Sequence, residues 1–449
     1  MKNNLKLLFV SLGCDKNLVD TEFMLGMLRD DGIEMTDDEQ EADIIIVNTC
    51  CFINDAKEES VNTILEMAEY KKTGPLKALI VTGCLAQRYK EEIKTEIPEV
   101  DAVLGTTSYG DIVKALNEAQ AGHVFQEFRD INELPEDSGR RVLTTGGHFG
   151  YLKIAEGCDK HCTYCIIPSL RGKFRSVPEE RLLAQAEYMA SQGVKELILV
   201  AQETTVYGTD LYGKKTLHIL LKKLCQIKGI RWIRVLYCYP EEIYDELIQV
   251  MKEEKKICNY LDLPIQHASD RILKRMGRRT TRKQLEDIIA KLRREIPDIV
   301  LRTSLITGFP GETQEDHEEL MEFVDEMEFD RLGVFTYSPE EGTPAETMEG
   351  QVPEEVKEER RDELMSLQQE ISLEKGDERI GQELLVMIEG KVSGESAYIA
   401  RTYADAPKVD GYIFVQTGEL LVTGDFARVR VTGALEYDLI GELADEYTE

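Results

Sequence analysis

The feature that most constrains this chain is a set of three apolar runs near its N-terminus, each of which ends in a cysteine. They are residues 7–14 (LLFVSLGC), 43–50 (DIIIVNTC) and 79–84 (LIVTGC), and helical periodicity follows, as in residues 62–70 (NTILEMAEY). Short apolar runs that alternate with helices are typical of a parallel sheet covered on both faces. Together with a fourth strand at 101–105, they predict an open parallel α/β domain over residues 1–120.

The first apolar run also resembles a short signal sequence that ends in a lipidated cysteine. The run is short, however, Lys6 abuts it, and residues 15–28 have the pattern of an amphipathic helix within a folded unit. We therefore interpret it as a buried first strand and expect a cytoplasmic protein with reduced cysteines. The sequence contains no run of eighteen apolar residues, so we expect no membrane span.

The alternation of strands and helices returns at larger scale after a polar linker over residues 121–148. It predicts a partial (β/α)6 barrel of the TIM type over residues 149–352, with strands at 151–155, 196–202, 232–237, 260–264, 299–307 and 332–337. A charged connecting helix that begins with proline occupies residues 353–376. Beyond it, short strands at 384–388, 412–416 and 427–431 predict a small antiparallel β-barrel over residues 377–449.

The cysteines carry the predicted chemistry. Cys158, Cys162 and Cys165 form the pattern C-x3-C-x2-C directly after the first strand of the predicted barrel. Three thiolates in one loop can ligate three irons of a [4Fe-4S] cluster and leave the fourth iron open for a small molecule. The alternative is a structural zinc site, which requires four ligands, and His161 is the one candidate for the fourth. Ten cysteines in 449 residues are too dilute for a disulfide scaffold.

A second set of thiols is predicted in the N-terminal domain. Cys14, Cys50 and Cys84 each follow a parallel strand, and the carboxyl ends of such strands share one edge where ligands bind. The three thiolates could therefore meet there around another cluster with an open iron. The alternative is that they are small buried hydrophobes, as free cysteines often are. The remaining cysteines are expected not to be ligands: Cys51, Cys225, Cys238 and Cys258.

Five segments, spread over essentially the whole chain, together resemble the radical S-adenosylmethionine (SAM) methylthiotransferase family. They are residues 11–22 (SLGCDKNLVDTE), the Cys158 motif, residues 263–267 (LPIQH) with Met276 and Arg278, residues 307–313 (TGFPGET) and residues 337–345 (YSPEEGTPA). The first segment is most similar to the RimO branch, whose members methylthiolate an aspartate of the twelfth small-subunit ribosomal protein. The tRNA-modifying MiaB type usually reads TYGC there. Asp15 departs from the pattern, since proline is common at that position.

The resemblance implies two [4Fe-4S] clusters and SAM. The cluster on Cys158, Cys162 and Cys165 would bind SAM and, once reduced, cleave it to a 5'-deoxyadenosyl radical. The cluster on the N-terminal cysteines would hold the sulfur that is methylated and passed to the substrate β-carbon. Because this chemistry belongs to the cofactors, no side chain is nominated as a general acid or base.

Side chains at the strand ends of the barrel are predicted to line the SAM pocket, because the loops at that end form the active face. The candidates are Tyr164, Gln202, Glu203, Ser304 and Gly308. Gln202 and Glu203 could instead cap a helix. Gly308 could be present merely because the turn requires glycine.

The net charge of the chain indicates which class of macromolecule it can bind. The chain has 54 lysines and arginines against 85 acidic residues, a net charge of −31, and residues 376–449, which resemble a TRAM domain, hold 15 acidic and 6 basic residues. Such a surface repels phosphate and suits a basic ribosomal protein, although acidity could merely favour solubility. Residues 271–295 hold ten basic and three acidic residues. With Arg171, Lys173 and Arg175 they could contact RNA, ribosomal RNA included, or pair with local acids.

These observations predict a monomeric enzyme, served by an external electron donor, that installs a methylthio group on an aspartate of a ribosomal protein. The same chemistry on an adenosine of tRNA is the first alternative. The second is a non-catalytic iron–sulfur protein that senses redox state.

Overall fold

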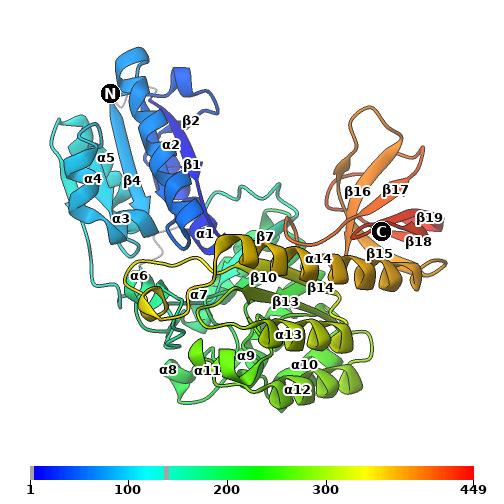
Figure 1. The fold of residues 1–449 in the computed structure, drawn as a ribbon. Coiled ribbons are helices and arrows are strands. Elements are labelled where there is room, and N and C mark those ends of the chain that lie inside the picture. The colour runs from blue at the N-terminus through cyan, green and yellow to red at the C-terminus, as the bar shows by residue number, and fades with distance from the viewer. Residues whose placement is uncertain (1–4, 136–140, 449) are drawn as a thin grey trace.

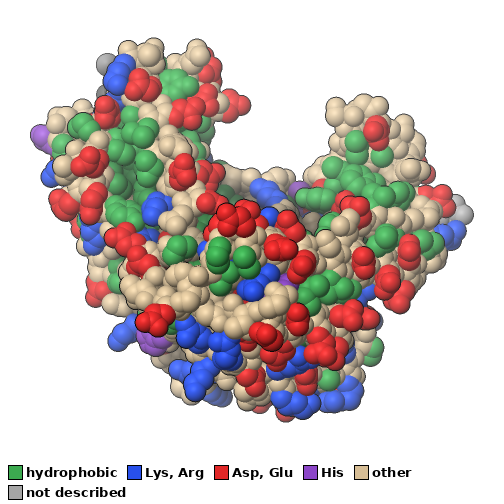
Figure 2. Space-filling view, in the orientation of Figure 1, with side chains coloured by type: hydrophobic (Ala, Val, Ile, Leu, Met, Phe, Trp, Pro, Cys, Tyr) green, Lys and Arg blue, Asp and Glu red, His purple; other side chains and the backbone are tan. Residues whose placement is uncertain are grey.

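Three large sheets, carried by consecutive parts of the chain, make up most of the fold (Figure 1). The computed structural model describes residues 5–135 and 141–448; residues 136–140 of the predicted linker lie outside this part. The N-terminal sheet and the C-terminal barrel stand on either side of the central sheet and its helices. The space-filling view shows a deep hollow between them (Figure 2).

The N-terminal sheet is parallel throughout, in the order β2-β1-β3-β4-β5-β6. Its strands are β1 (Lys6–Ser11), β2 (Glu34–Met35), β3 (Ile44–Thr49), β4 (Ala78–Gly83), β5 (Ala102–Leu104) and β6 (Phe125–Glu127). Its helices are α1 (Asp15–Asp30), α2 (Asn54–Thr73), α3 (Cys84–Arg88), α4 (Lys90–Glu96) and α5 (Ile112–Gln120). Every residue of β3 and β4 is buried, as expected for central strands of a sheet covered by helices.

The central sheet is also parallel, and its strands lie side by side in chain order. They are β7 (Phe149–Lys153), β10 (Glu196–Val200), β11 (Trp232–Val235), β12 (Ile257–Asp262), β13 (Val300–Thr307) and β14 (Arg331–Thr336). Sequential order with a crossover after each strand is the pattern of a β/α barrel. Among the described strands β7 and β14 do not pair, so the barrel is open on one side. A two-stranded ladder of β8 (Ala155–Glu156) and β9 (Arg175–Ser176) frames the loop of Cys158.

The helices of the central part are mostly amphipathic. They are α6 (Ile167–Arg171), α7 (Glu179–Ser191), α8 (Thr209–Tyr212), α9 (Leu217–Leu224), α10 (Asp245–Glu253), α11 (Asp270–Arg275), α12 (Arg282–Glu295) and α13 (Gln314–Met327). A hydrophobic stripe at helical spacing lets such helices cover one face of the sheet. No helix in the described part of the chain is both long and apolar enough to span a membrane.

The two faces of the central sheet pack against different elements because successive side chains of a strand point to opposite faces. Leu197 and Leu199 of β10 belong to the core beneath the outer helices. Ile198 of the same strand belongs to a second core, which it shares with Phe23 of α1 and with Phe426 of the C-terminal barrel. The inner face of the open barrel is therefore the surface on which the N-terminal and C-terminal parts dock.

The helix α14 (Glu354–Asp377) carries the chain from the central part to the C-terminal barrel (Figure 1). That barrel closes in the order β15-β16-β17-β19-β18. Its strands are β15 (Glu383–Lys391), β16 (Ala397–Thr402), β17 (Ile413–Gln416), β18 (Phe426–Ala434) and β19 (Leu439–Thr448). Its pairs are antiparallel except for β17 with β19.

The predicted fold class is confirmed: a parallel N-terminal α/β sheet, a partial (β/α)6 barrel and a closed C-terminal β-barrel. Six strands were not predicted, β2, β6, β8, β9, β16 and β19, although the strand predicted at 151–155 reaches the first residue of β8. The first two are edge strands of two and three residues, too short to show an alternating pattern. β6 lies in the segment predicted to be a linker.

Gly83, at the end of β4, offers a test of how tightly the strand ends are packed. Its φ is +94°, and an added Cβ would lie 2.4 Å from Asn48 Oδ1 and 2.5 Å from the Thr49 carbonyl. Gly122 has a comparable φ of +77° but open space around it. We expect Gly83→Ala to lower the free energy of unfolding by about 2 kcal/mol more than Gly122→Ala, measured by denaturant titration. Equal losses would contradict this packing.

Candidate functional site

The three N-terminal cysteines lie at the carboxyl edge of the N-terminal sheet. Cys14 precedes the first turn of α1, Cys50 directly follows β3, and Cys84 begins α3. Neighbouring atoms show how close these strand ends are, since a Cβ added at Gly13 would lie 2.7 Å from Cys50 Cβ and 3.0 Å from its sulfur. Cys50 and Cys84 are buried, whereas Cys14 is exposed. The strand register therefore brings together the three thiols that the sequence assigned to one edge.

Asn17 holds these strand ends in place. Its side chain is fully buried, and Nδ2 donates to the carbonyls of Leu12 at 3.2 Å and Thr49 at 3.0 Å. Its Oδ1 lies 3.9 Å from the sulfur of Cys84. One side chain in the first turn of α1 thus contacts the backbone next to Cys14 and Cys50 as well as the third thiol itself.

The two buried N-terminal thiols, those of Cys50 and Cys84, are costly to ionise without a cation. Burial, with a contribution from Cys84, raises the pKa of Cys50 to about 11. Burial also raises the pKa of Cys84, although Arg171 opposes the shift. A thiolate that binds a metal must lose its proton, so a cation seated here would offset this cost directly.

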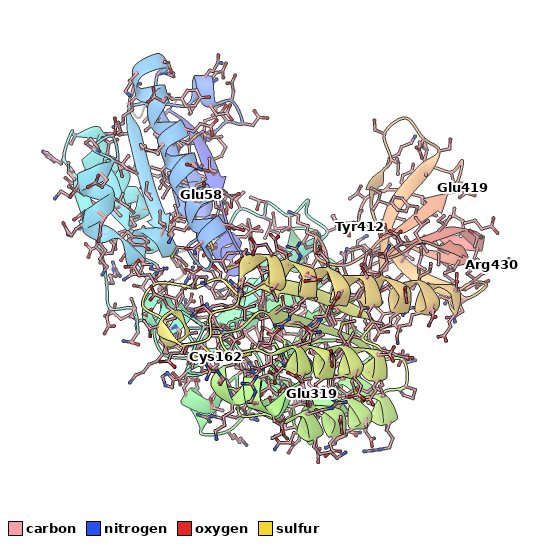
Figure 3. The ribbon with its side chains drawn as sticks, viewed as in Figure 1. Glu58, Cys162, Glu319, Tyr412, Glu419 and Arg430 are labelled. Atoms are coloured by element: carbon pink, nitrogen blue, oxygen red, sulfur yellow. The ribbon has the colours of Figure 1, made fainter. Side chains whose placement is uncertain are left out.

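The second set of cysteines lies in the loop between β8 and β9 (Figure 3 labels Cys162). Cys158 and Cys162 are buried and Cys165 is partly exposed. Burial raises the pKa of Cys158 to about 11 and that of Cys165 to about 12. The Cys162 sulfur lies 3.7 Å from the hydroxyl of Tyr239, a residue that follows β11.

A buried arginine flanks this loop. The guanidinium of Arg278 lies 4.3 Å from the ring centroid of Tyr239, and its Nη2 donates to the Pro264 carbonyl at 2.8 Å. Its Nε and Nη1 have no hydrogen-bond partner among the described residues although both are buried. Two unpaired buried donors beside Cys162 point to an anionic group in the neighbouring space.

A buried network of charges joins the N-terminal domain to the Cys158 loop. Arg171, at the end of α6, donates through Nη1 to Asp20 at 2.9 Å and to Glu156 at 3.2 Å, and through Nη2 to Asn17. Lys153 also donates to Asp20, and to Glu156 at 2.7 Å. All five side chains are no more than 7% exposed. Two cations and two anions therefore balance within one buried cluster, as burial requires.

The charges in this network stabilise one another. Burial would raise the pKa of Glu156, but Lys153 and Arg171 outweigh that effect and hold the pKa well below its usual range. Burial would lower the pKa of Arg171, yet Cys84, Glu156 and Asp20 hold it well above its usual range. Glu156 and Arg171 are therefore both charged at neutral pH.

Three of the predicted SAM contacts lie close to the cysteine sites. Tyr164 lies beside Cys162 and Cys165, which contribute to an upward shift in its pKa that burial dominates. Gln202 donates to Glu156 at 3.0 Å and so belongs to the charge network, while its buried Oε1 has no partner among the described residues. Glu203 accepts at Oε1 from the Thr205 amide at 2.9 Å, and its buried Oε2 likewise has no described partner.

The other two lie further along the barrel. Ser304, on β13, accepts through its carbonyl from the amide of Gln266 at 2.9 Å. A Cβ at Gly308 would lie 2.1 Å from Cγ of Lys357, so this turn lies directly under α14. The roles assigned to Tyr164, Gln202, Glu203, Ser304 and Gly308 stay predictions.

The donor chemistry fits iron–sulfur clusters and SAM. Thiolates are soft ligands that select iron–sulfur clusters, zinc or copper(I). Within residues 5–135 and 141–448, no three cysteine, histidine or acidic side chains converge tightly enough to hold a single metal ion. A cluster binds each thiolate to a different iron, so its ligands need not converge on one point. The unpaired Oε2 of Glu203 is an acceptor suited to the amino group of a bound molecule.

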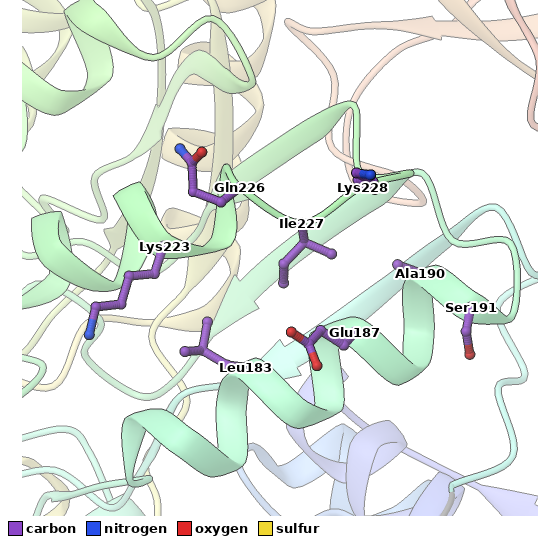
Figure 4. A pocket seen from close by; sticks show the side chains of 8 residues that line it. All are labelled: Leu183, Glu187, Ala190, Ser191, Lys223, Gln226, Ile227 and Lys228. Atoms are coloured by element: carbon purple, nitrogen blue, oxygen red, sulfur yellow. The ribbon is translucent and has the colours of Figure 1, made fainter.

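The other cysteines and the larger cavity lie elsewhere. Cys51, Cys225, Cys238 and Cys258 are buried within the hydrophobic cores. A cavity of about 580 Å³ lies between α7 and the segment after α9, lined by residues such as Leu183, Glu187, Lys223 and Ile227 (Figure 4). These segments precede β10 and β11, so the cavity is at the amino ends of the strands, away from the two sets of predicted ligand cysteines. A second cavity, of about 500 Å³, is lined by Cys158 and His161 among others.

Sequence reasoning missed Asn17, Arg171 and Tyr239 as residues of the site. Asn17 was part of a quoted motif, but nothing in a single sequence shows that its amide spans three strand ends. For Arg171 the sequence leaves two options open, contact with RNA or pairing with local acids, because it follows the cysteine loop among other basic residues. The spacing of six residues after Cys165 carries no signal of burial, which only the docking of two domains creates.

Matches to known proteins cover the chain from end to end. Family models match residues 6–105 (Uncharacterized protein family UPF0004), 152–324 (Radical SAM superfamily) and 380–444 (TRAM domain). The ribosomal protein uS12 methylthiotransferase RimO of Lachnoclostridium phytofermentans is 65% identical over 437 residues, which are 97% of this chain and 99% of that protein. The protein of the same name from Clostridioides difficile is 51% identical over 98% of this chain and 99% of its own length.

Solved structures share the fold at low identity. The radical SAM methyltransferase TsrM from Kitasatospora setae, solved with cobalamin and a [4Fe-4S] cluster bound, gives a TM-score of 0.55 at 14% identity. The match covers 76% of this chain and 74% of that protein. The cobalamin-dependent SAM radical enzyme OxsB gives 0.52 at 16% identity, over 81% of this chain and 56% of that one.

The environment of Glu203 predicts a pH-dependent stability. Burial raises its pKa from the ordinary 4.5 to about 7. The folded protein then binds this proton more tightly than the unfolded chain, so the free energy of unfolding should fall as pH rises from about 4.5 to about 7. In cluster-free protein, we expect Glu203→Gln to gain about 3 kcal/mol relative to wild type across that window, measured by denaturant titration. Glu58→Gln, at an exposed site on α2, is the control, and a pH-independent difference would contradict the assignment.

Proposed function

This chain belongs to the RimO family of ribosomal protein uS12 methylthiotransferases, and on that premise we propose that it installs a methylthio group on the β-carbon of an aspartate in uS12. The observation that carries the proposal is the juxtaposition of two cysteine sets. The buried contacts of Arg171 connect the edge that holds Cys14, Cys50 and Cys84 to the loop that holds Cys158, Cys162 and Cys165. A reaction that cleaves SAM at one site and transfers sulfur from another needs such an arrangement.

The proposed cofactors are two [4Fe-4S] clusters and SAM, with one cluster on each cysteine set. When bound, the clusters supply the electron for SAM cleavage and the sulfur for transfer. The protein supplies position and environment. We further propose that the enzyme works as a cytoplasmic monomer supplied by an external electron donor.

The side chains around the Cys158 loop have distinct tasks in this proposal. Glu203 accepts from the amino group of SAM through its unpaired Oε2. Arg278 and Tyr239 cover Cys162 on the barrel side and keep water from that thiolate. Tyr164 packs edge to face with Phe309, with ring centroids 6.4 Å apart, and so closes the loop against the turn after β13.

The charge distribution favours a basic protein over RNA. Figure 2 shows acidic side chains gathered over α14, below the hollow between the two outer domains. The exposed acidic residues at the start of this helix are Glu354, Glu355, Glu358, Glu359, Asp362 and Glu363. A surface of this kind repels a phosphate backbone and attracts lysine and arginine.

Half of the ten basic residues at 271–295 pair with neighbouring acids. Arg282 lies within 4 Å of four glutamates on α12 and α13, and Arg271 pairs with Asp316. Lys291 pairs with Asp245, and Arg278 is buried against Tyr239. Cations engaged in this way offer little to RNA. The remaining basic residues keep tRNA as the second candidate substrate.

The choice of substrate can be tested by intact-mass analysis. Incubation of purified uS12, or of small ribosomal subunits, with the reconstituted enzyme, SAM and reductant should add one methylthio group to uS12. The aspartate is then located by fragmentation of the modified peptide. Unmodified uS12 alongside thiomethylated tRNA in a parallel reaction would reverse the proposed order. Absence of 5'-deoxyadenosine in both would favour a redox sensor.

Cysteine variants test the division of labour between the two sets. We expect about eight irons per anaerobically reconstituted chain, and about four in either Cys84→Ala or Cys162→Ala. Cys162→Ala should abolish 5'-deoxyadenosine formation because it removes a ligand of the SAM site. Cys84→Ala should retain that formation and lose methylthio transfer. Cys225→Ala, a buried cysteine outside both sets, is the matched control, and equal loss of SAM cleavage in both ligand variants would contradict the scheme.

A further inference from the structure

Arg171 has no task of its own in the proposed reaction, although it connects the two cysteine sets. Its side chain is 2% exposed and extends from α6, the short helix that follows Cys165, to α1, the helix that follows Cys14. Each of its hydrogen-bonded partners is itself buried. Burying a guanidinium is costly, so the surrounding structure is arranged to hold it there.

On the N-terminal side, Arg171 acts on all three cysteine-bearing strand ends through Asn17. Its Nη2 donates to Oδ1 of Asn17, the same oxygen that lies 3.9 Å from the sulfur of Cys84. This contact fixes the orientation of the Asn17 amide, so that Nδ2 points to the Leu12 and Thr49 carbonyls beside Cys14 and Cys50. Asn17 cannot turn over without losing these bonds.

On the barrel side, Arg171 is tied to the strand that leads into the Cys158 loop. Its Nη1 donates to Glu156, two residues before Cys158, and Glu156 also accepts from Lys153 and Gln202. Nη1 donates as well to Asp20, one turn beyond Asn17 on α1. The guanidinium therefore bonds to both domains at once, within a few residues of each cysteine set.

We propose that Arg171 is a positioning residue that fixes the N-terminal cysteine site relative to the SAM site and supplies a buried positive charge beside it. The inference rests on one part of the proposed function, namely that Cys14, Cys50 and Cys84 hold a cluster. Sulfur transfer depends on Arg171 because it needs both sites in the correct relative position. SAM cleavage does not, because it needs only the SAM site.

The geometry requires arginine rather than lysine. Three acceptors on two domains, those of Asn17, Asp20 and Glu156, surround the planar fork. An ammonium group carries the charge but has neither the span nor the fixed directions of a guanidinium. A positive charge near a cluster also stabilises its reduced, more negative state and so raises its reduction potential.

The test uses two substitutions and a matched control in the full-length protein. Arg171→Gln removes the charge and Arg171→Lys keeps it, while Arg294→Gln makes the same change at an exposed arginine on α12. Each is made in the wild-type chain and in a Cys158→Ala, Cys162→Ala, Cys165→Ala background, in which the N-terminal cysteines alone can hold a cluster. The readouts are the reduction potential of that cluster by EPR-monitored titration, 5'-deoxyadenosine formation, and methylthio transfer.

We expect Arg171→Gln to shift the potential to a more negative value than Arg294→Gln, and Arg171→Lys to leave it close to wild type. Methylthio transfer should fall about 10-fold to 100-fold in both Arg171 variants, while 5'-deoxyadenosine formation stays within about twofold of the control. If Arg171→Gln fails to fold, the loss of transfer with retained cleavage in Arg171→Lys supports the proposal.

Three results would overturn the proposal. Transfer at the level of the Arg294→Gln control in both Arg171 variants would show that the contact has no role. Loss of cleavage in proportion to transfer would make Arg171 a support of the SAM site or of the fold. Absence of iron from the triple-alanine background with Arg171 intact would refute the proposed function itself, and the inference with it.

Discussion

The arrangement of this molecule depends on a buried pairing of charges between two domains. Arg171 and Lys153 of the central part meet Asp20 of α1 and Glu156 of β8, and Asn17 completes the set. Buried charges are tolerated only when each finds a partner, and removing one leaves an uncompensated charge at a cost of about 3–5 kcal/mol. The network therefore specifies one docking geometry, and with it the placement of the two cysteine sets.

The open barrel makes this docking possible. Since β7 and β14 do not pair among the described strands, the inner face of the sheet remains accessible, and α1 packs on it through Phe23. The C-terminal barrel uses the same face at Phe426, and Arg401 forms a buried pair there with Glu196 of β10. A partial barrel with two docked domains thus leaves a hollow between them, above the acidic start of α14 (Figure 2).

Most of the fold could be predicted because burial imposes a pattern on sequence. β3 and β4 each begin with four apolar residues, and topology alone places the cysteines that follow them at one edge. The short edge strand β2 and the contacts of Arg171 could not be predicted, since they arise from neighbours distant in the chain. The role of Gly308 in a SAM pocket stays a prediction, and the contact of its turn with Lys357 of α14 could not be foreseen because the two are far apart in the chain.

We propose that two thiolate-bound iron sites lie on either side of Arg171. The most direct test of this proposal is an anomalous difference map at the iron edge, from crystals of the anaerobically reconstituted protein. The account predicts two iron peaks, one bounded by Cys14, Cys50 and Cys84 and one by Cys158, Cys162 and Cys165, with the Arg171 guanidinium between them. A single peak, or an N-terminal peak on a side of its sheet that faces away from the barrel, would contradict it.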